Sequence, residues 1–365
     1  MEKYNFYKNR AEENKSFKLD ENLRLPFELS RDEQFPMFKR DENHQSTDTI
    51  KRGEEYNPSE ALIHAVNVAL MLHKPLLLTG APGTGKSDLA WHLAHHFGWG
   101  EVEHFATRTD SVATDLLYRY DSLAHFQKVN IKKEGSEELT VAQIEEMFIT
   151  YVALGRAIRD SSGQNNEGVP RRRVVLIDEI DKAPRDLPND ILTIIEEMSF
   201  EVPQLKTAEG IQFPSKDKPI YKKTGNDELK PVVILTSNSE KTLPEAFLRR
   251  CVFFHIPMPG TIELMEILLA KKSILPDISK QEGGEFIKLF FSISDLVKGK
   301  KPATHELILW IWWMRRHGFS PNDLYQFEKT SEHAKTLLSG ISVLAKEADD
   351  WKRVTDAITS NTLKG

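Results

Sequence analysis

The sequence predicts an α/β fold, in which a parallel sheet with flanking helices is followed by an all-α domain. Between residues 56 and 259, short apolar runs alternate with segments of helical periodicity, which favours parallel strands joined by helical crossovers. A glycine-rich loop directly follows the first of these apolar runs. From Gly260 onward the pattern turns helical.

The predicted sheet is built from short buried strands. A helix begins at Asn57-Pro58-Ser59, ends before Pro75, and is followed by the apolar run Leu76 to Thr79. Further strands are expected at Val102–Ala106, Val174–Ile177 and Val232–Thr236. Two stretches interrupt this alternation, so we expect inserts near residues 126–170, with an amphipathic helix over Val141–Ile158, and near 200–231, as an exposed hairpin or loop.

The two ends of the chain differ from this core. Residues 1–55 are highly charged with scattered aromatic side chains, which predicts an arm that orders only by docking, or a strap against a neighbouring subunit. Residues 260–365 predict a helical lid domain. Its expected helices are Ile262–Ala270, Phe286–Val297, Ala303–Met314, Leu337–Leu344 and Trp351–Ile358.

The composition indicates a globular chain of more than one domain. Its 365 residues correspond to two or three domains of roughly 150 residues each. Hydrophobic residues make up 39% and charged residues 28%, which leaves enough apolar mass for a core. The 49 basic and 55 acidic side chains give a net charge of −6, which argues against a nucleic-acid partner.

Cysteine usage and hydropathy indicate the compartment. The single cysteine, Cys251, excludes an internal disulfide framework and a multi-cysteine zinc site, and it fits a reducing environment. Residues Met1 to Lys18 alternate charges without the apolar run of a signal peptide. The longest apolar stretch, Leu307 to Met314, has eight residues, whereas a membrane span needs about 20. We therefore expect a cytoplasmic protein without a membrane partner.

The strongest motif is a phosphate-binding loop. It fits the pattern G-x-x-x-x-G-K-[ST] between a predicted strand and a predicted helix, and a random chain of this length matches about one time in a hundred. Its residues are Gly80, Ala81, Pro82, Gly83, Thr84, Gly85, Lys86 and Ser87. The glycines let successive N–H groups point at phosphate oxygens. Lys86 would reach the β and γ phosphates of a nucleotide, and the Ser87 hydroxyl would ligate magnesium.

Two acids follow the strand Val174–Ile177. Ligands of such sheets bind at the carboxyl ends of the strands, where Asp178 would hold the magnesium through water and Glu179 would polarise the attacking water. Taken alone, two acids after a strand fit helix capping equally well. Their position downstream of a phosphate loop favours the functional interpretation.

A third group of polar residues follows the strand Val232–Thr236. Asn238 would orient the attacking water or sense the γ-phosphate, and a turn-forming Asn is the alternative. Arg249 and Arg250 come shortly after it, at the end of a predicted helix. They would reach into a neighbouring subunit's site as arginine fingers, with Arg250 favoured, or they would form a solvated face.

In this order of elements the chain resembles the AAA+ ATPases, and within them the MoxR family. The resemblance runs from about residue 56 to the C-terminus and rests on Lys74–Lys86, Asp115–Asp121, Leu176–Pro184 and Thr236–Asn238 with Leu243–Cys251. It implies a P-loop NTPase sheet (the AAA+ core), a helical lid, and a homo-oligomeric ring, usually a hexamer, with ATP and Mg²⁺ bound between subunits. It also suggests that Cys251 lies at a buried strand start, so we expect its thiol to be unreactive. The same resemblance implies a protein client or a von Willebrand factor A-type partner.

One part of the lid departs from this resemblance. Many AAA+ lids present an arginine to the nucleotide from the start of a helix, whereas residues 300–306 contain none. Lys301 or His305 would take that role, or the role is absent.

Three other features favour structural roles. His92, His95 and His96 have the spacing of a metal site on one helix, but surface histidines are the favoured interpretation. The run Arg171–Arg173 predicts a solvated strand entry rather than a phosphate contact. The apolar stretch with Trp310, Trp312 and Trp313 predicts lid core rather than a partner surface.

Three functions fit the sequence. The first is an ATPase that remodels or activates a protein partner, as a chaperone does. The second is a nucleotide-gated scaffold that recruits an effector, for example in a bacterial defence assembly. The third is a DNA-acting motor, against which the net charge of −6 argues.

Overall fold

The computed structural model describes residues 52–130, 141–163, 168–205, 220–222, 229–238, 242–320 and 332–360. Most of the predicted arm, residues 1–55, lies outside these ranges. Within them the chain forms two compact units. The first contains Glu60–Thr79 and Ala90–Phe254, and the second contains Lys51–Ser59, Gly80–Leu89 and His255–Gly365.

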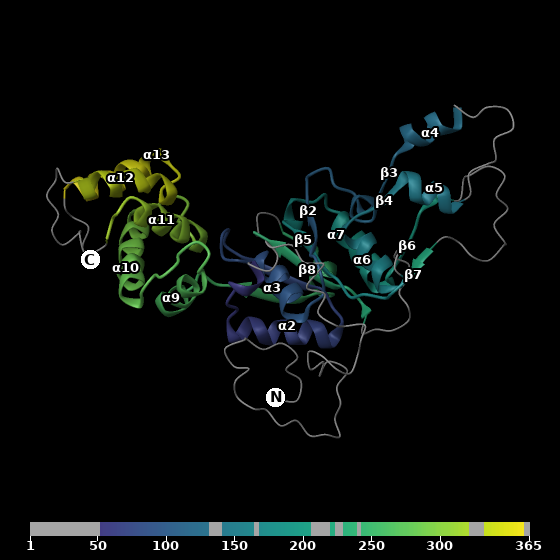
Figure 1. The fold of residues 1–365 in the computed structure, drawn as a ribbon, viewed down its shortest axis with the longest axis horizontal. Helices are drawn as coiled ribbons and strands as arrows, with labels where there is room; N and C mark the ends of the chain where they lie inside the picture. The colour runs from purple at the N-terminus through teal and green to yellow at the C-terminus, as the bar shows by residue number, and fades with distance from the viewer. Residues whose placement is uncertain are drawn as a thin grey trace, which may run out of the picture. The chain divides into compact units, whose positions relative to one another are not determined.

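A five-stranded sheet forms the centre of the α/β part (Figure 1). Its order is β2 (Glu103–Ala106), β5 (Val174–Asp178), β8 (Val232–Ser237), β1 (Leu76–Gly80) and β9 (Val252–Ile256). Strands β2 and β5, β5 and β8, and β8 and β1 pair in parallel, so their carboxyl ends lie at one edge of the sheet. This confirms the predicted parallel sheet. Strand β9 begins directly after Cys251, but the expectation that this strand start is buried is wrong, since Val252 is half-buried and Phe253 is 56% exposed.

Helices cover both faces of this sheet, which is why its central strands read as continuous apolar runs. Alternate residues of β5 and β8, including Val175, Ile177 and Leu235, pack in one hydrophobic cluster with α6 (Ala153–Ser161) and α7 (Leu187–Glu197). The residues between them, such as Leu176 and Ile234, are also buried. Helices α2 (Glu60–Leu72) and α3 (Asp88–Phe97) lie on the other side of the strands in Figure 1.

The expected helix over Val141–Ile158 is wrong in its middle. The chain forms α5 (Val141–Phe148), then β4 (Ile149–Tyr151), then α6, and β4 pairs antiparallel with β3 (Tyr118–Tyr120). Ile, Thr and Tyr favour a strand, and cross-strand pairing with β3 prevails over the helical period of the segment. After β4 the Val152 N–H donates to the Leu117 carbonyl at 3.0 Å, which turns the chain into α6.

Shorter elements complete the first unit. Of the exposed hairpin or loop predicted near residues 200–231, the structure describes the antiparallel pairing of β6 (Ser199–Glu201) with β7 (Ile220–Lys222), which fits a hairpin, while most residues between the two strands lie outside the described ranges. Helix α4 (Ser122–Asn130) follows β3, and α8 (Glu245–Leu248) precedes β9. The 3-10 turns are η5 (Ala113–Leu116), η6 (Ile180–Lys182) and η7 (Pro203–Leu205).

The C-terminal region is helical, as predicted. Its helices are α9 (Thr261–Ala270), α10 (Lys280–Leu296), α11 (Thr304–Arg316), α12 (Glu332–Leu344) and α13 (Ala348–Thr359). Helix α10 begins six residues before the expected Phe286, because the Ser279 hydroxyl caps it by accepting the Glu282 N–H. Trp310 is fully buried in the core of this region, whereas Trp312 is 37% exposed. No described helix is long and apolar enough to cross a membrane.

Two predictions of surface positions are wrong. His92 and His95 are buried, at 6% and 4% exposure, because α3 turns this side inward. Arg172 is also buried, with its guanidinium 4.9 Å from the centre of the Trp99 ring and its Nε donating to the Lys230 carbonyl. The sequence pattern predicted that water would solvate the Arg172 guanidinium. In the structure the Trp99 ring and the Lys230 carbonyl contact it instead.

Arg173, next in the chain, forms a nearly buried ion pair. Its Nε lies 2.7 Å from Asp160 Oδ2, and the two side chains are 14% and 7% exposed. Removing one partner of a buried pair leaves the other charge without compensation. We therefore expect Arg173→Ala to lower the free energy of unfolding by roughly 3 kcal/mol, measured by urea denaturation.

The matched control is Arg249→Ala. Arg249 also pairs with a carboxylate, that of Glu245, but both side chains are more than three-quarters exposed. Such surface pairs contribute less than about 1 kcal/mol. Equal destabilisation by the two substitutions would contradict the assignment of Arg173 to a buried pair.

The thiol of Cys251 is protonated. Burial raises the pKa of Cys251 to about 12, so the thiol stays protonated, in line with the expectation that it is unreactive.

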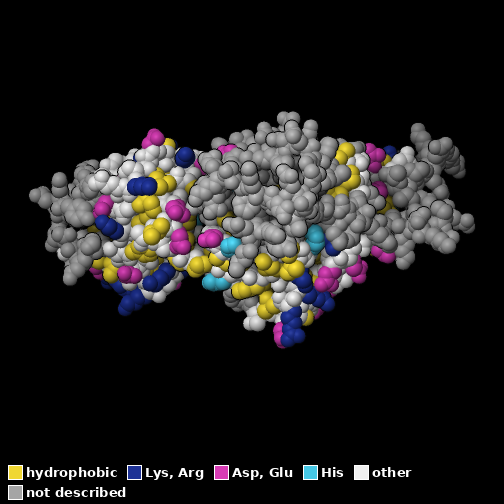
Figure 2. All heavy atoms as spheres, turned by 90° about the horizontal axis from the view of Figure 1, so that it is seen from below, with side chains coloured by type: hydrophobic (Ala, Val, Ile, Leu, Met, Phe, Trp, Pro, Cys, Tyr) yellow, Lys and Arg dark blue, Asp and Glu magenta, His cyan; other side chains and the backbone are white. Residues whose placement is uncertain are grey.

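Figure 2 views the molecule from the side on which α2 lies in Figure 1, and hydrophobic side chains are exposed there among charged ones. Val68, Met71 and Leu72 of α2 are between 44% and 52% exposed.

Candidate nucleotide site

The phosphate loop follows β1 and leads into α3, as its motif requires. Its three glycines have positive φ angles of 150° at Gly80, 78° at Gly83 and 83° at Gly85. A Cβ added at Gly80 would lie 2.5 Å from the Ile256 carbonyl oxygen, a backbone atom that cannot yield. The glycines therefore give the loop both its left-handed turns and its close approach to β9.

Lys86 lies inside this loop. Its side chain is 7% exposed, and its ammonium donates to the Gly80 and Ala81 carbonyl oxygens at 2.8 and 2.9 Å. The Thr84 hydroxyl also donates to the Ala81 carbonyl, at 2.8 Å. A buried ammonium that donates to neutral carbonyls is well placed to exchange them for phosphate oxygens, which carry full charge.

A segment before α2 packs against the same loop. The half-buried Tyr56 ring lies 3.1 Å from the position of a Cβ at Gly85, and Arg52 forms an ion pair with Asp88 at the start of α3. Burial, and secondly the Asp88 charge, raises the pKa of the Tyr56 hydroxyl, which stays protonated. Tyr56 was not predicted as a site residue, because its only local signal is its place before the helix start at Asn57.

The residues just before the same helix tie this segment to the helical region. Glu55 accepts hydrogen bonds from the Ser273 N–H at 2.6 Å and the Ser273 hydroxyl at 2.8 Å. Asn57 donates to Glu266 on α9 at 3.2 Å. The loop, residues 52–59 and the helical region thus pack as parts of one unit.

The start of α11 also touches the loop. A Cβ at Gly83 would lie 3.1 Å from Ala303 Cβ, 3.5 Å from His305 Cβ and 3.4 Å from Glu306 Oε2. The Glu306 carboxylate accepts the Ala303 N–H at 3.1 Å and so caps the helix. The stretch for which a lid contact was predicted therefore lies against the loop, and His305 and Glu306 are among its residues there.

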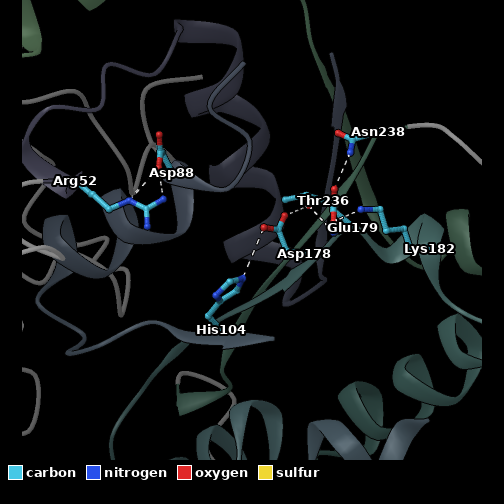
Figure 3. A network of polar contacts seen from close by, with 8 residues as sticks. All are labelled: Arg52, Asp88, His104, Asp178, Glu179, Lys182, Thr236 and Asn238. Atoms are coloured by element: carbon cyan, nitrogen blue, oxygen red, sulfur yellow. Dashed lines mark hydrogen bonds and ion pairs between the residues drawn. The ribbon is translucent and has the colours of Figure 1, made fainter. Parts of the chain in front are cut away.

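Asp178 and Glu179 lie at the carboxyl end of β5 and share the Thr236 hydroxyl of the neighbouring strand β8. Thr236 Oγ1 donates to Asp178 Oδ1 and accepts the Glu179 N–H at 2.9 Å. Thr236 is fully buried. Figure 3 shows the side chains of Asp178, Glu179, Thr236 and Asn238 pointing toward one another.

Glu179 has an unusual backbone conformation and two side-chain partners. Its φ and ψ angles are 56° and 48°, a left-handed conformation that costs a non-glycine residue roughly 1–3 kcal/mol. Asn238 Nδ2 donates to Oε1 at 3.1 Å, and Lys182 Nζ donates to Oε2 at 2.6 Å. The structure thus brings together three of the predicted residues, Asp178, Glu179 and Asn238.

Three further residues of this network were not predicted. Thr236 was predicted only as the last residue of an apolar strand, and Lys182 only as one residue of the stretch Leu176–Pro184 that carries the family resemblance. His104 Nε2 lies 3.7 Å from Asp178 Oδ2, and the His104 ring packs edge-on against Trp91 of α3. No local signal marks His104, because its approach to Asp178 follows from the register in which β2 pairs with β5.

The two arginines lie at the end of α8 and pair with other acids. Arg249 pairs with Glu245 on the same helix, and Arg250 Nε lies 3.7 Å from Glu196 Oε1 on α7. Arg250 is about half exposed, at 45%. Both remain predictions as arginine fingers, since such a role concerns a second subunit.

The residues predicted to hold magnesium have suitable chemistry. Mg²⁺ binds oxygen ligands, and the Ser87 hydroxyl and the Asp178 carboxylate provide them. Asp178 is 24% exposed, and its Oδ1 accepts the Thr236 hydroxyl. The donor set fits the ion.

Comparison with known families agrees with this geometry. Residues 75–251 match the family model of the AAA domain (dynein-related subfamily). No curated protein matches the chain. The matched range contains the phosphate loop, the acids after β5 and Asn238 after β8, each in the order that the parallel sheet requires. The match and the fold together support an AAA+ ATPase.

Proposed function

We propose that this chain hydrolyses ATP. The observation that carries the proposal is the network at the ends of β5 and β8, in which the Thr236 hydroxyl joins Asp178 to Glu179 and Asn238 binds the Glu179 carboxylate. A structural cap needs one acid and no strained backbone, whereas this site holds Glu179 in a left-handed conformation. Strain of this kind is typical of functional sites.

The phosphate loop would bind the triphosphate. The N–H groups of the loop would bind phosphate oxygens, and Lys86 would exchange carbonyl partners for the β and γ phosphates. Ser87 and Asp178 would hold Mg²⁺, which neutralises phosphate charge.

Hydrolysis would depend on Glu179. Its carboxylate would accept a hydrogen bond from the attacking water and draw off a proton as the water attacks the γ-phosphate. Asn238 would keep that carboxylate in place. The electrostatic stabilisation of the transferred group would come from Lys86 and the loop amides.

The direct test uses the wild-type chain. Calorimetry should show saturable binding of ATP in the presence of Mg²⁺, and a phosphate-release assay should show turnover that stops when Mg²⁺ is chelated. Absence of binding heat with a folded protein would refute nucleotide binding. Binding without any turnover would favour the nucleotide-gated scaffold instead.

We propose that active sites form between copies of the chain in a ring, with a hexamer favoured by the MoxR resemblance. Arg250, half exposed on α8, would then supply a guanidinium to the neighbouring site. We expect Arg250→Ala and Lys86→Ala chains to be inactive separately and to regain part of their phosphate release when mixed. A mixture as inactive as its components would contradict a shared site.

We further propose that the chain acts on a protein, as a MoxR-like remodelling ATPase with a client or a von Willebrand factor A-type partner. Helix α4 supports a protein partner, since Leu123 and Phe126 on it are 65% and 68% exposed. Figure 1 shows α4 and α5 standing out beyond the central sheet. Stimulation of turnover by DNA, lost at high salt, would instead favour a DNA-acting motor.

A further inference from the structure

Lys182 forms an ion pair with the proposed water-polarising carboxylate. Its Nζ lies 2.6 Å from Glu179 Oε2, and both side chains are 38% exposed. The pair forms within one turn, because Lys182 follows Glu179 by three residues in η6. Figure 3 shows Asn238 above the Glu179 carboxylate and Lys182 beside it, each joined to it by a dashed line.

Lys182 and Asn238 together bind both oxygens of this carboxylate. Asn238 takes Oε1 at 3.1 Å from the end of β8, and Lys182 takes Oε2 from η6. A glutamate side chain has three rotatable bonds, so one donor leaves it free to rotate, whereas two donors on different oxygens fix its plane. A carboxylate offers about four acceptor sites, so a water can still be bound.

We propose that Lys182 is a positioning residue for Glu179, and that it holds the carboxylate in the orientation from which it polarises the attacking water. This inference rests on the proposed ATP hydrolysis. The opposite effect, in which the ammonium withdraws charge from the carboxylate and slows hydrolysis, is weaker. Water screens the electrostatic interaction of a half-exposed ion pair, so the ammonium changes the basicity of the carboxylate little. Misplacement of a reacting group by one ångström, in contrast, can lower the reaction rate about a hundredfold.

The test compares the kinetics of Lys182 variants. We expect Lys182→Met to lower kcat about fivefold, the scale of a partly exposed ion pair, with KM for ATP and the melting temperature unchanged. Lys182→Arg, which keeps a cation in reach of Glu179, should recover most of that loss. An unchanged or raised kcat in Lys182→Met would overturn the proposal. If Lys182→Met proves unstable, Lys182→Gln replaces it.

A double-mutant cycle separates positioning from a general structural effect. Lys182→Met and Asn238→Ala should be non-additive in kcat, because both act on the Glu179 carboxylate. Lys288→Met is the matched control, since Lys288 forms the same three-residue ion pair with Glu285 on α10, at 3.0 Å. Additive effects of Lys182→Met and Asn238→Ala would also overturn the proposal.

The outcomes also separate this inference from the proposed function. A wild-type chain that binds ATP without turnover refutes the proposed hydrolysis. If Glu179→Gln abolishes turnover but Lys182→Met retains the full rate, hydrolysis stands and the positioning role is refuted.

Discussion

We expect the Glu179→Gln variant to bind ATP as the wild type does and to hydrolyse it about 10²- to 10⁴-fold more slowly, the usual contribution of a positioned acid–base group. Glutamine keeps the size of the side chain and its hydrogen bond to Asn238, but it cannot accept a proton. The phosphate loop is untouched, so affinity should stay. Phosphate release and equilibrium binding of a fluorescent nucleotide measure the two quantities separately.

Glu285→Gln is the control for this substitution. Glu285 is also paired with a lysine three residues away, but it lies on α10 of the helical region. Its variant should hydrolyse ATP at the wild-type rate. A Glu179→Gln variant as active as this control would remove Glu179 from the mechanism. Full activity on a partner protein without turnover would favour the scaffold.

The second large effect concerns Lys86. We expect Lys86→Met to lower kcat/KM for ATP about 10²- to 10³-fold, the scale for loss of one preorganised donor. Methionine has a similar length and suits a buried position, since Lys86 is 7% exposed, but it brings no charge to the phosphates. Calorimetry should show weaker ATP binding in this variant, whereas Glu179→Gln should bind normally.

Lys74→Met is the control for the loss of a lysine near this loop. Lys74 is exposed and precedes β1, on which the loop is built. Because Lys86→Met also leaves the Gly80 and Ala81 carbonyls without their donor, the melting temperature must be compared as well. Wild-type kinetics in a folded Lys86→Met variant would refute the assignment of the loop to phosphate binding.

The sequence predicted the parts of the fold that have strong local patterns. The strands at Leu76, Val174 and Val232 are short apolar runs between helical segments, and this pattern allows few structures other than a buried parallel sheet. The loop motif likewise requires a strand before it and a helix after it. Segments with two competing preferences were predicted less well: Ile149–Tyr151 lies within a helical period but pairs with β3.

The burial of individual polar side chains also could not be predicted from the sequence pattern. Arginine is usually exposed and histidine is intermediate in burial, yet Arg172 and His92 are both buried. Their surroundings come from distant segments: Arg172 stacks on Trp99 and donates to Lys230. A pattern read along one segment cannot contain such partners, because they depend on how strands and helices pack.

The amino acids along the chain thus specified an α/β core with a phosphate loop, the acids Asp178 and Glu179, and a helical C-terminal region, because each has a local pattern of period or spacing. Tertiary structure decided which side chains surround those acids. Thr236 bridges them because β8 pairs with β5, and His104 reaches Asp178 because β2 pairs with the other edge of β5. Lys182 becomes a partner of Glu179 because the left-handed backbone at Glu179 starts a tight turn. Strand register and backbone conformation are set by packing across the whole sheet.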